Sequence, residues 1–332
     1  MMIVISGGPL ATVQDLGRMG HRVLGIGTAG AMDRLALTLG NILLGNPRHA
    51  AGVELAASGF SVRFESDTWF ALTGGDCRAR LDDTPVLPWW TMPVRKGQVL
   101  SLRPPAGDMF AYLTVAGGID IPPVMDSRST DLKGRFGGLN GRALTRDDVL
   151  PIGVPHEPRP IGRNSGFGIR APRAVRPVRS AATEPVPAIV RVLPAAEYDA
   201  FPADRVAALW AAQWSLQNDS NRVGYRLAGP SVQPAQPLEL WSHGILPGVV
   251  QVPPSGQPVV QMADANTCGG YPKIGVVITA DLGRLAQVRP GGKIRFMKVS
   301  HGEAVAAIRT ENDYLDGVAR FVSLAAMARS SA

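Results

Sequence analysis

The sequence predicts a mainly β protein of two domains, with few helices and one long helix at the C-terminal end. Its 332 residues suggest two domains, because a domain usually takes roughly 100–200 residues. Glycine (38) and proline (28) are both plentiful, which favours many short strands joined by turns. Only roughly the last thirty residues have the period of one long amphipathic helix.

The N-terminal half reads as a series of short strands with one helix. The strands are short apolar or alternating runs separated by breaks rich in glycine and aspartate; they are residues 52–55, 60–64, 69–72, 95–102 and 110–115. In the helix, Leu35, Leu39 and Leu43 share a face, Asp33 is placed as the N-cap, and Gly45 begins the stop. The predicted N-terminal β-rich domain spans residues 1–154.

Residues 155–187 form the predicted domain boundary. This segment is rich in proline, arginine, glycine and serine and has no sustained apolar period, so it reads as a linker or long surface loop. The predicted C-terminal domain, residues 188–332, has strands and one helix before the long terminal helix. The strands are residues 189–193, 249–252, 259–262, 275–279 and 293–299, and the helix is residues 201–213.

The two halves share a faint repeat that predicts two related β-barrel-like units. Residues 71–76 (ALTGGD) precede a glycine-containing strand at 95–99, and residues 277–281 (VITAD) precede a similar strand at 289–294. The alternative is that turns before strands often look alike.

Charge and composition exclude several classes of function. The formal net charge is +7, but the linker holds six arginines against two acids. A basic linker without an aromatic-interleaved basic face is a weak electrostatic footprint, so no nucleic-acid partner is predicted. No apolar run approaches the roughly 18–20 residues of a membrane span, and no secretory leader is visible. Two cysteines without a CxxC pair favour a reducing cytoplasm.

Several motifs that would make the chain an enzyme by itself are missing. The sequence has no GxxxxGK[ST] phosphate loop, no GxGxxG between a strand and a helix, and no GxSxG. The five histidines are scattered, without HExxH or a Cys/His cluster, so no metal site is predicted. The chain is therefore expected to work together with other subunits.

The segment from Asp264 to Lys273 combines polar groups with two glycines. Asp264, Thr267, Gly269 and Gly270 are predicted to bind substrate, since glycines let a backbone approach a ligand closely. The side chains of Tyr271 and Lys273 can stabilise an oxyanion or a carboxylate. The alternative is a tight hairpin loop with a solvated lysine.

A second polar segment lies at residues 220–227. Arg222 is suited to bidentate binding of a carboxylate, and Tyr225, three residues later, is predicted to bind substrate. The alternative is that Arg222 and Arg226 are surface residues flanking a core tyrosine.

Two further segments supply candidates for substrate binding. Near the N-terminus, polar residues alternate with glycines; the candidates there are Gln14, Asp15, Arg18 and Asp33, the last of which could instead only cap its helix. At residues 243–258, Gln251 and Gln257 could hydrogen-bond an amide or lactam, with His243 nearby. Cys77 and Cys268 lack a visible basic partner and are expected to be small packed residues.

Taken in order, motifs along nearly the whole chain resemble the family that includes the C subunit of 5-oxoprolinase, allophanate hydrolase subunit 2, KipA-like proteins and biotin-dependent carboxyltransferases. The motifs are residues 12–18, 30–33, 116–123, 127–130, 221–227, 247–253 and 269–274. Two positions depart from the family pattern: Cys268 stands where relatives usually carry threonine, and Val223 where many carry methionine.

The resemblance implies cyclophilin-like β-barrel units and a 5-oxoprolinase complex with two partners, an A subunit, and a B subunit of the KipI type. It implies that this complex opens 5-oxo-L-proline to L-glutamate with ATP, bound by a component that the sequence leaves open. Arg222, Tyr271 and Lys273 are suited to a catalytic role there. Two alternatives stay open. One is part of a carboxyltransferase that acts on urea or a similar amide, although the chain has no biotin-carrier Met-Lys-Met motif. The other is a non-enzymatic regulator that binds a KipI-like partner.

Overall fold

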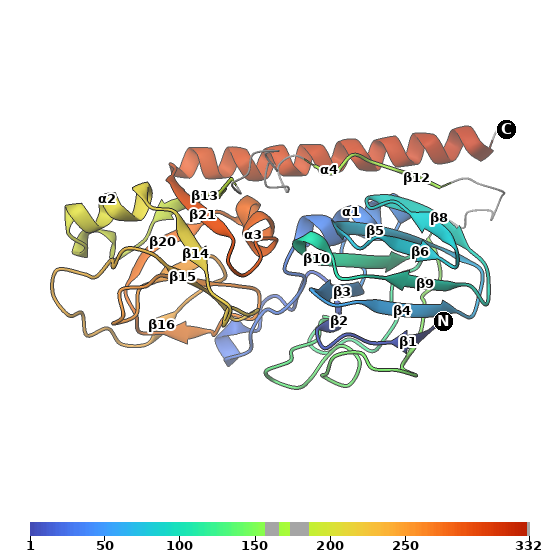
Figure 1. Cartoon of the computed structure of the whole chain (residues 1–332), viewed down its shortest axis with the longest axis horizontal. Coiled ribbons are helices and arrows are strands. Elements are labelled where there is room, and N and C mark those ends of the chain that lie inside the picture. Colours follow the sequence, from blue (N-terminus) through green and yellow to red (C-terminus); the bar gives the residue numbers. More distant parts are fainter. Residues whose placement is uncertain (157–165, 173–185, 331–332) are drawn as a thin grey trace. The chain divides into compact units, whose positions relative to one another are not determined.

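The computed structural model describes residues 1–156, 166–172 and 186–330, and the chain divides into two compact units (Figure 1). Unit 1 comprises Met1–Arg18, Ala29–Ala171 and Asn312–Ala332, and unit 2 comprises Met19–Thr28 and Pro172–Glu311. The mainly β class is confirmed. The unit boundary near residue 171 falls inside the predicted linker, of which residues 157–165 and 173–185 lie outside the described residues.

Unit 1 is built from two six-stranded sheets. The first has the strand order β11 (Val149–Leu150), β1 (Met2–Ser6), β4 (Phe60–Phe64), β9 (Val99–Leu102), β6 (Ala79–Leu81) and β7 (Thr84–Val86). The second has the order β12 (Phe167–Gly168), β8 (Trp90–Val94), β5 (Thr68–Asp76), β10 (Ala106–Val115), β3 (Gly52–Ala56) and β2 (Ala11–Gln14). Strand β12 lies within the predicted linker and pairs with β8.

The core of unit 1 lies between these sheets. Phe64 of the first sheet stacks on Phe70 of the second, with ring centroids 5.7 Å apart, and both side chains are fully buried. Helix α1 (Arg34–Leu44) packs on β5 and β10. Its N-cap is Asp33, whose carboxylate accepts a hydrogen bond from the Ala36 amide at 3.0 Å. The sequence offered this capping role as the alternative to substrate binding by Asp33.

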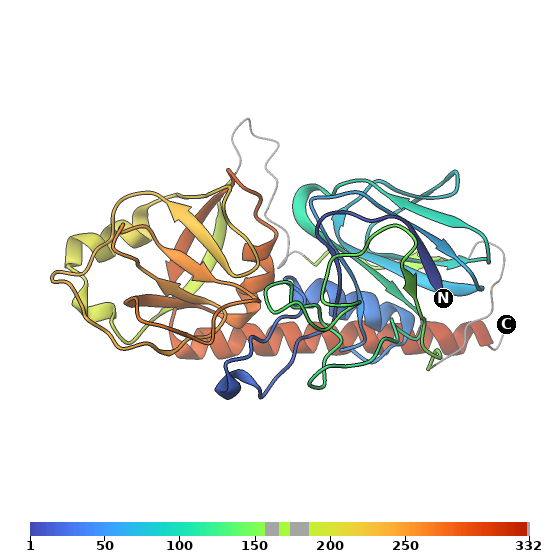
Figure 2. The ribbon, with the colours of Figure 1, turned by 90° about the horizontal axis from the view of Figure 1, so that it is seen from below.

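Unit 2 contains a closed seven-stranded barrel (Figure 2). The ring order is β13 (Ala188–Pro194), β20 (Lys273–Val277), β17 (Val249–Gln251), β18 (Val259–Gln261), β15 (Gly224–Ala228), β14 (Trp214–Leu216) and β21 (Lys293–Lys298). Strands β21 and β13 run parallel where they close the ring. A fully buried Trp214 packs near Phe296 in the core.

Short elements surround the barrel. A two-stranded ribbon joins β16 (His243–Gly244) to β19 (Cys268–Gly269), so that His243 pairs with Gly269. The helices are α2 (Ala203–Ala211), α3 (Thr279–Ala286) and the 3₁₀ turns η1 (Arg22–Leu24) and η2 (Tyr198–Ala200). The barrel and its connecting turns bring residues far apart in the sequence to the cluster described below.

The long C-terminal helix is confirmed as α4 (His301–Ser330). It begins with a capping box, in which Ser300 and Glu303 exchange hydrogen bonds. Leu315, Val318 and Val322 form its buried face in unit 1. Among the described residues, no helix has the combination of length and apolarity that a membrane span requires.

Candidate active site

A buried charged cluster in unit 2 centres on Lys273, the first residue of β20. The carboxylate of Glu197, in the turn before η2, accepts from the Lys273 backbone N–H at 3.0 Å and lies 3.1 Å from its ammonium through the same oxygen, Oε2. The Lys273 ammonium also contacts Nε2 of His243 on β16. The side chains of Lys273 and Glu197 are only 11% and 17% exposed. The cluster therefore holds an ammonium and a carboxylate largely away from bulk water, next to the partly exposed imidazole of His243.

The protonation of His243 can be assigned from its two neighbours. Its Nδ1 lies 2.7 Å from the carbonyl oxygen of Trp241. A carbonyl oxygen only accepts, so Nδ1 must carry the proton. The ammonium of Lys273 only donates, so Nε2 must present its lone pair. The contacts thus fit a neutral imidazole, protonated at Nδ1, that accepts a hydrogen bond from Lys273.

Two glutamines extend the cluster across the neighbouring strands. Gln251 pairs directly with Lys273 between β17 and β20. Its amide donates to the carbonyl of Tyr271 at 3.4 Å, and its Oε1 accepts from Nε2 of Gln261 at 2.9 Å. Because the Tyr271 carbonyl can only accept, it fixes the orientation of both amides. Oε1 of Gln261 is then left as a buried acceptor without a hydrogen-bond partner among the described residues.

The predicted glycines Gly269 and Gly270 allow close packing around these amides. A Cβ at Gly269 would lie 2.9 Å from Nε2 of Gln251, and one at Gly270 would lie 2.8 Å from the Leu240 carbonyl oxygen. Thr267 contributes its carbonyl, which accepts from the Ile245 amide at 3.1 Å and continues the β16–β19 pairing. Glycine is therefore needed here for packing, whatever approaches the cluster.

Arg222 and Asp264 are brought together, and they bind each other. Nε and a terminal guanidinium nitrogen of Arg222 each lie 2.9 Å from one carboxylate oxygen of Asp264. The Asp264 amide also donates to the Arg222 carbonyl at 2.9 Å. This bidentate pair is mostly buried. A substrate carboxylate would have to share or displace Asp264, so the predicted role of Arg222 in catalysis stays a prediction.

Two other predicted residues of unit 2 form hydrogen bonds with backbone groups outside the Lys273 cluster. The hydroxyl of Tyr225 donates to the Ala286 carbonyl at 2.8 Å, deep in the barrel. The amide of Gln257 bonds both the N–H and the carbonyl of Gly229, at 2.9 and 3.2 Å. Their roles in substrate binding stay predictions.

The N-terminal candidates lie in unit 1 and form buried hydrogen-bond networks. The carboxylate of Asp15 accepts from the Gly17 amide, the Arg128 amide and two serine hydroxyls; these hydroxyls belong to Ser127 and Ser129. Arg18 donates to the Ser129 carbonyl and lies over the Phe136 ring, 4.6 Å from its centroid. These contacts connect the loop of Asp15 and Arg18 to the loop of Ser127–Ser129. Substrate binding by Asp15 and Arg18 stays a prediction.

Gln14 and Asp33 have similar local partners. Gln14 donates to the Thr12 hydroxyl at 3.0 Å and the Thr130 carbonyl at 3.2 Å. The amide of Asp33 donates to the hydroxyl of Tyr112, which in turn donates to Glu54. Burial, together with the nearby charges of Glu54 and Asp33, raises the pKa of Tyr112 well above its ordinary value. This network fixes the start of α1 on the sheet.

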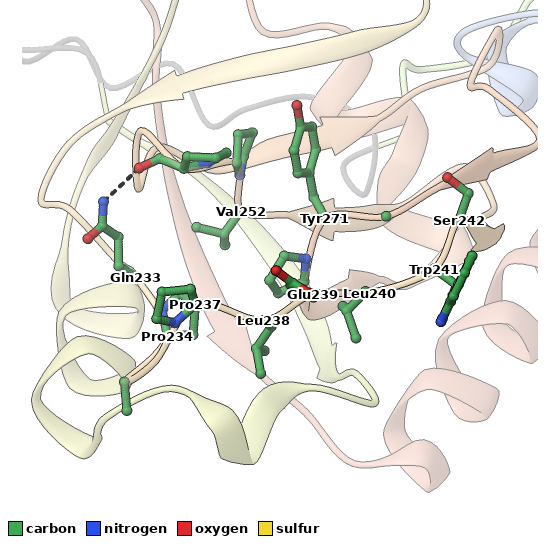
Figure 3. A pocket seen from close by; sticks show the side chains of 15 residues that line it. Gln233, Pro234, Pro237, Leu238, Glu239, Leu240, Trp241, Ser242, Val252 and Tyr271 are labelled. Atoms are coloured by element: carbon green, nitrogen blue, oxygen red, sulfur yellow. Dashed lines mark hydrogen bonds between the residues drawn. The ribbon is translucent and has the colours of Figure 1, made fainter.

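An apolar cavity of about 830 Å³ adjoins the segments that carry the cluster (Figure 3). Its lining includes the residues just before His243, just before Lys273 and just after Gln251, among them Trp241, Tyr271 and Val252. Trp241 is 93% exposed and Tyr271 49%. Gln233, at the other end of the cavity, donates to the Pro254 carbonyl at 2.7 Å. The cavity walls offer contact area to an apolar or planar group.

The described residues offer no fit for ATP or a metal ion at this cluster. Nowhere in residues 1–156, 166–172 and 186–330 do three or more His, Cys, Asp or Glu side chains gather to hold a metal. A magnesium triphosphate requires several cations and backbone donors around its oxygens. Here the Lys273 ammonium is already offset by Glu197. The residues of this cluster therefore do not fit ATP.

Three members of the cluster have little or no signal in the sequence. Glu197 and Gln261 carry no local signal, because their place depends on barrel register: Glu197 follows β13, and Gln261 ends β18. His243 stands out in the sequence only as a histidine beside a polar loop. Gln251, which the sequence singled out, lies opposite Lys273 in the ladder of β17 and β20, and Gln261 reaches it only through a side-chain hydrogen bond.

Known proteins resemble the chain over almost its full length. A family model described as carboxyltransferase domain, subdomain A and B, matches residues 24–298. The chain is 43% identical to the C subunit of 5-oxoprolinase from Haemophilus influenzae over 312 residues, which is 94% of this chain and 96% of that protein. It is 44% identical to the C subunit of 5-oxoprolinase from Escherichia coli over 319 residues, 96% of this chain and 98% of that protein.

Longer proteins contain a similar region. Urea amidolyase of Lachancea kluyveri is 30% identical over 308 residues, 90% of this chain but 17% of that protein. The crystal structure of the Kluyveromyces lactis urea carboxylase superposes with a TM-score of 0.86 at 27% identity, covering 96% of this chain and 29% of that one. A crystal structure of TTHA0988 gives a TM-score of 0.77 at 32% identity, covering 89% of this chain and 55% of that one.

Proposed function

Because the chain belongs to the family of carboxyltransferase domains, subdomain A and B, we propose that it is the C subunit of an ATP-dependent 5-oxoprolinase. The observation that carries the proposal is the end-to-end match with two proteins named as the C subunit of 5-oxoprolinase, at 43% and 44% identity. The match with the urea amidolyase is weaker, at 30%, and spans 17% of that much longer protein. The two matches with C subunits of 5-oxoprolinase therefore carry more weight.

The proposed reaction adds water across the lactam C–N bond of 5-oxo-L-proline and gives L-glutamate, with ATP hydrolysis as the driving force. A lactam carbonyl is a poor electrophile, so the γ-phosphoryl group of ATP is proposed to move to its oxygen with release of ADP. One water then adds to the activated carbon and the C–N bond breaks, which gives an acyl phosphate that a second water hydrolyses to L-glutamate and inorganic phosphate. Fixed cations and amide donors stabilise the negative charge on the phosphoryl oxygens during these steps. The complex is proposed to contain the A and B subunits of 5-oxoprolinase, to bind ATP outside the cluster described above, and to be cytoplasmic.

The Lys273 cluster has the groups that a lactam would need. The ammonium of Lys273 donates to Glu197 and His243 and has one further N–H, since an ammonium carries three. That N–H could bind a carboxylate or a developing oxyanion. The buried Oε1 of Gln261 could accept the lactam N–H once the ligand has entered. The hydroxyl of Tyr271 is half exposed beside the cavity and is a further donor.

The experiment that tests the proposal is reconstitution of the enzyme from its components. The purified A and B subunits are assayed for glutamate formation from 5-oxo-L-proline and ATP, with and without this chain. We expect the rate to depend on the chain and to fall at least tenfold in Lys273→Met, as loss of one transition-state donor typically causes. The control is Lys293→Met, which removes a lysine from β21 in the same unit. Unchanged turnover when the chain is omitted refutes the proposal.

A carboxyltransferase function is the second candidate, because the family model and the urea carboxylase superposition favour it. It would transfer a carboxyl group from a biotin carried on another chain to urea or a similar amide. Bicarbonate-dependent carboxylation that avidin abolishes would favour this candidate. Glutamate formation that is insensitive to avidin would exclude it for this complex.

A further inference from the structure

Two side chains determine where the Lys273 ammonium lies, and one of them can change its charge near neutral pH. We propose that Glu197 and His243 are positioning residues for Lys273, and that His243 performs this role only as a neutral imidazole. Protonation of His243 then switches the site off. The activity test of this inference rests on the proposed function.

Glu197 fixes the lysine by holding both of its ends. The same oxygen, Oε2, accepts from the backbone N–H of Lys273 at 3.0 Å and lies 3.1 Å from the ammonium. A lysine side chain has four flexible carbons and is costly to order. The carboxylate of Glu197 binds both the backbone N–H and the ammonium of Lys273. The ammonium is therefore held near the start of β20. The carboxylate also offsets the positive charge, which lowers the cost of burying it.

His243 provides the second acceptor only while Nε2 is unprotonated. Its Nδ1–H is committed to the Trp241 carbonyl at 2.7 Å, so an added proton has only Nε2 to occupy. That proton would point at the Lys273 ammonium and replace a hydrogen bond with a contact between two cations. The net charge of the three groups would change from zero to +1. Lys273 would lose its acceptor, and its third N–H would lose its fixed direction.

The remaining charged or titratable groups around His243 are few among the described residues. Glu239 lies in the same loop, Cys268 on the paired strand β19, and Tyr271 just before Lys273. Arg22 donates to the carbonyls of Ile245 and Asn266 at the end of the ribbon. The hydrogen bonds of the imidazole itself go to Trp241 and Lys273. Histidine is the group in this set that ordinarily changes charge between about pH 5 and 8.

The decisive measurement is the pH dependence of kcat in the reconstituted complex. Wild type should lose about tenfold in rate per pH unit on the acid side, the behaviour of a single essential base. His243→Gln should lack this acid limb and keep its rate at pH 8 within about fivefold, because a carboxamide oxygen accepts from Lys273 and does not titrate. Glu197→Gln should keep the limb at a lower rate. His301→Gln, an exposed histidine at the start of α4, is the matched control.

Each alternative outcome has a stated meaning. An unchanged acid limb in His243→Gln overturns the inference, as does an assembled His243→Gln complex that is inactive at every pH. If this variant fails to assemble, His243→Asn takes its place under the same criteria. If even the wild-type complex makes no glutamate, the proposed function fails. The inference is then judged by ¹⁵N spectra of the histidines in the full chain at pH 8. A neutral His243 protonated at Nδ1, with an Nε2 signal that moves in Lys273→Met, supports it. An Nε2–H tautomer overturns it.

Discussion

Removing the guanidinium of Arg222 tests whether this residue stabilises the barrel or binds substrate. In Arg222→Ala the carboxylate of Asp264 would lose both of its 2.9 Å hydrogen bonds from Arg222. Asp264 would remain in a site where its side chain is 7% exposed. Breaking a buried pair on one side costs about 3–5 kcal/mol, since the remaining charge is uncompensated. We expect the low end, about 3 kcal/mol, because the Arg222 side chain is itself 12% exposed.

The matched variant removes both charges at once. Arg222→Met with Asp264→Leu leaves no buried charge behind, and such replacements are often neutral or stabilising. Urea unfolding followed by circular dichroism gives the free energy of unfolding, and a 3 kcal/mol loss corresponds to roughly 6–12 °C in Tm for a unit of this size. We expect the single variant to be destabilised and the double variant to recover most of the loss.

Two results would refute this reasoning. A change below about 1 kcal/mol in Arg222→Ala would place the pair among those that contribute little. A double variant no more stable than the single one would show that the guanidinium matters for another reason. If the double variant is stable but the complex turns over at least tenfold more slowly, Arg222 also contacts substrate, as the sequence predicts.

Two further predictions concern groups whose titration the fold alters. Burial, with a smaller effect of Asp76, raises the pKa of Cys77 to about 12. The expectation of a packed residue was wrong for Cys268, which is exposed at the end of the ribbon. At pH 8 a thiol reagent should therefore react with Cys268 and reach Cys77 only after unfolding, and fast modification of both in the folded protein would contradict this. Hydrogen bonds from Arg142 lower the pKa of Asp148 below its ordinary 3.8. Asp148 therefore adds stability above that pH and loses it as the pH falls through the lowered pKa. The difference in unfolding free energy between wild type and Asp148→Asn should be constant near neutrality and shrink in acid, and a constant difference down to pH 2 would contradict the assignment.

The local elements were predictable because their signals are local. The α1 helix has an apolar face, an N-cap at Asp33 and a stop at Gly45, and each is visible in the sequence and present in the structure. The long terminal helix was likewise predictable, because its apolar residues recur with the period of an α-helix. The divided units were not predictable in this way. Residues 19–28 cluster with unit 2 and residues 312–332 with unit 1, and no local composition marks either exchange.

The candidate site shows the same limit more sharply. Lys273 and Gln251 stand out through glycine and polar neighbours, and the structure sets them opposite each other. Glu197 lies 76 positions before Lys273, in a turn that has no distinctive sequence feature. Its role depends on β13 and β20 being neighbours in the barrel. Long-range pairing is decided by the packing of the whole unit, so a single sequence offers no local feature that would reveal it.

Two segments of the C-terminal unit, around Arg222 and before Lys273, make different kinds of contact. The segment around Arg222 and Tyr225 is bound to Asp264 and to the Ala286 carbonyl, and these contacts fix its side chains within unit 2. The segment that ends at Lys273 places an ammonium beside the carboxylate of Glu197 and the imidazole of His243. We therefore expect substitutions around Arg222 to lower mainly the stability of the protein, and substitutions of Lys273 to lower mainly its turnover. Variants of the first should recover activity when their stability is restored, whereas variants of Lys273 should stay inactive however stable they are.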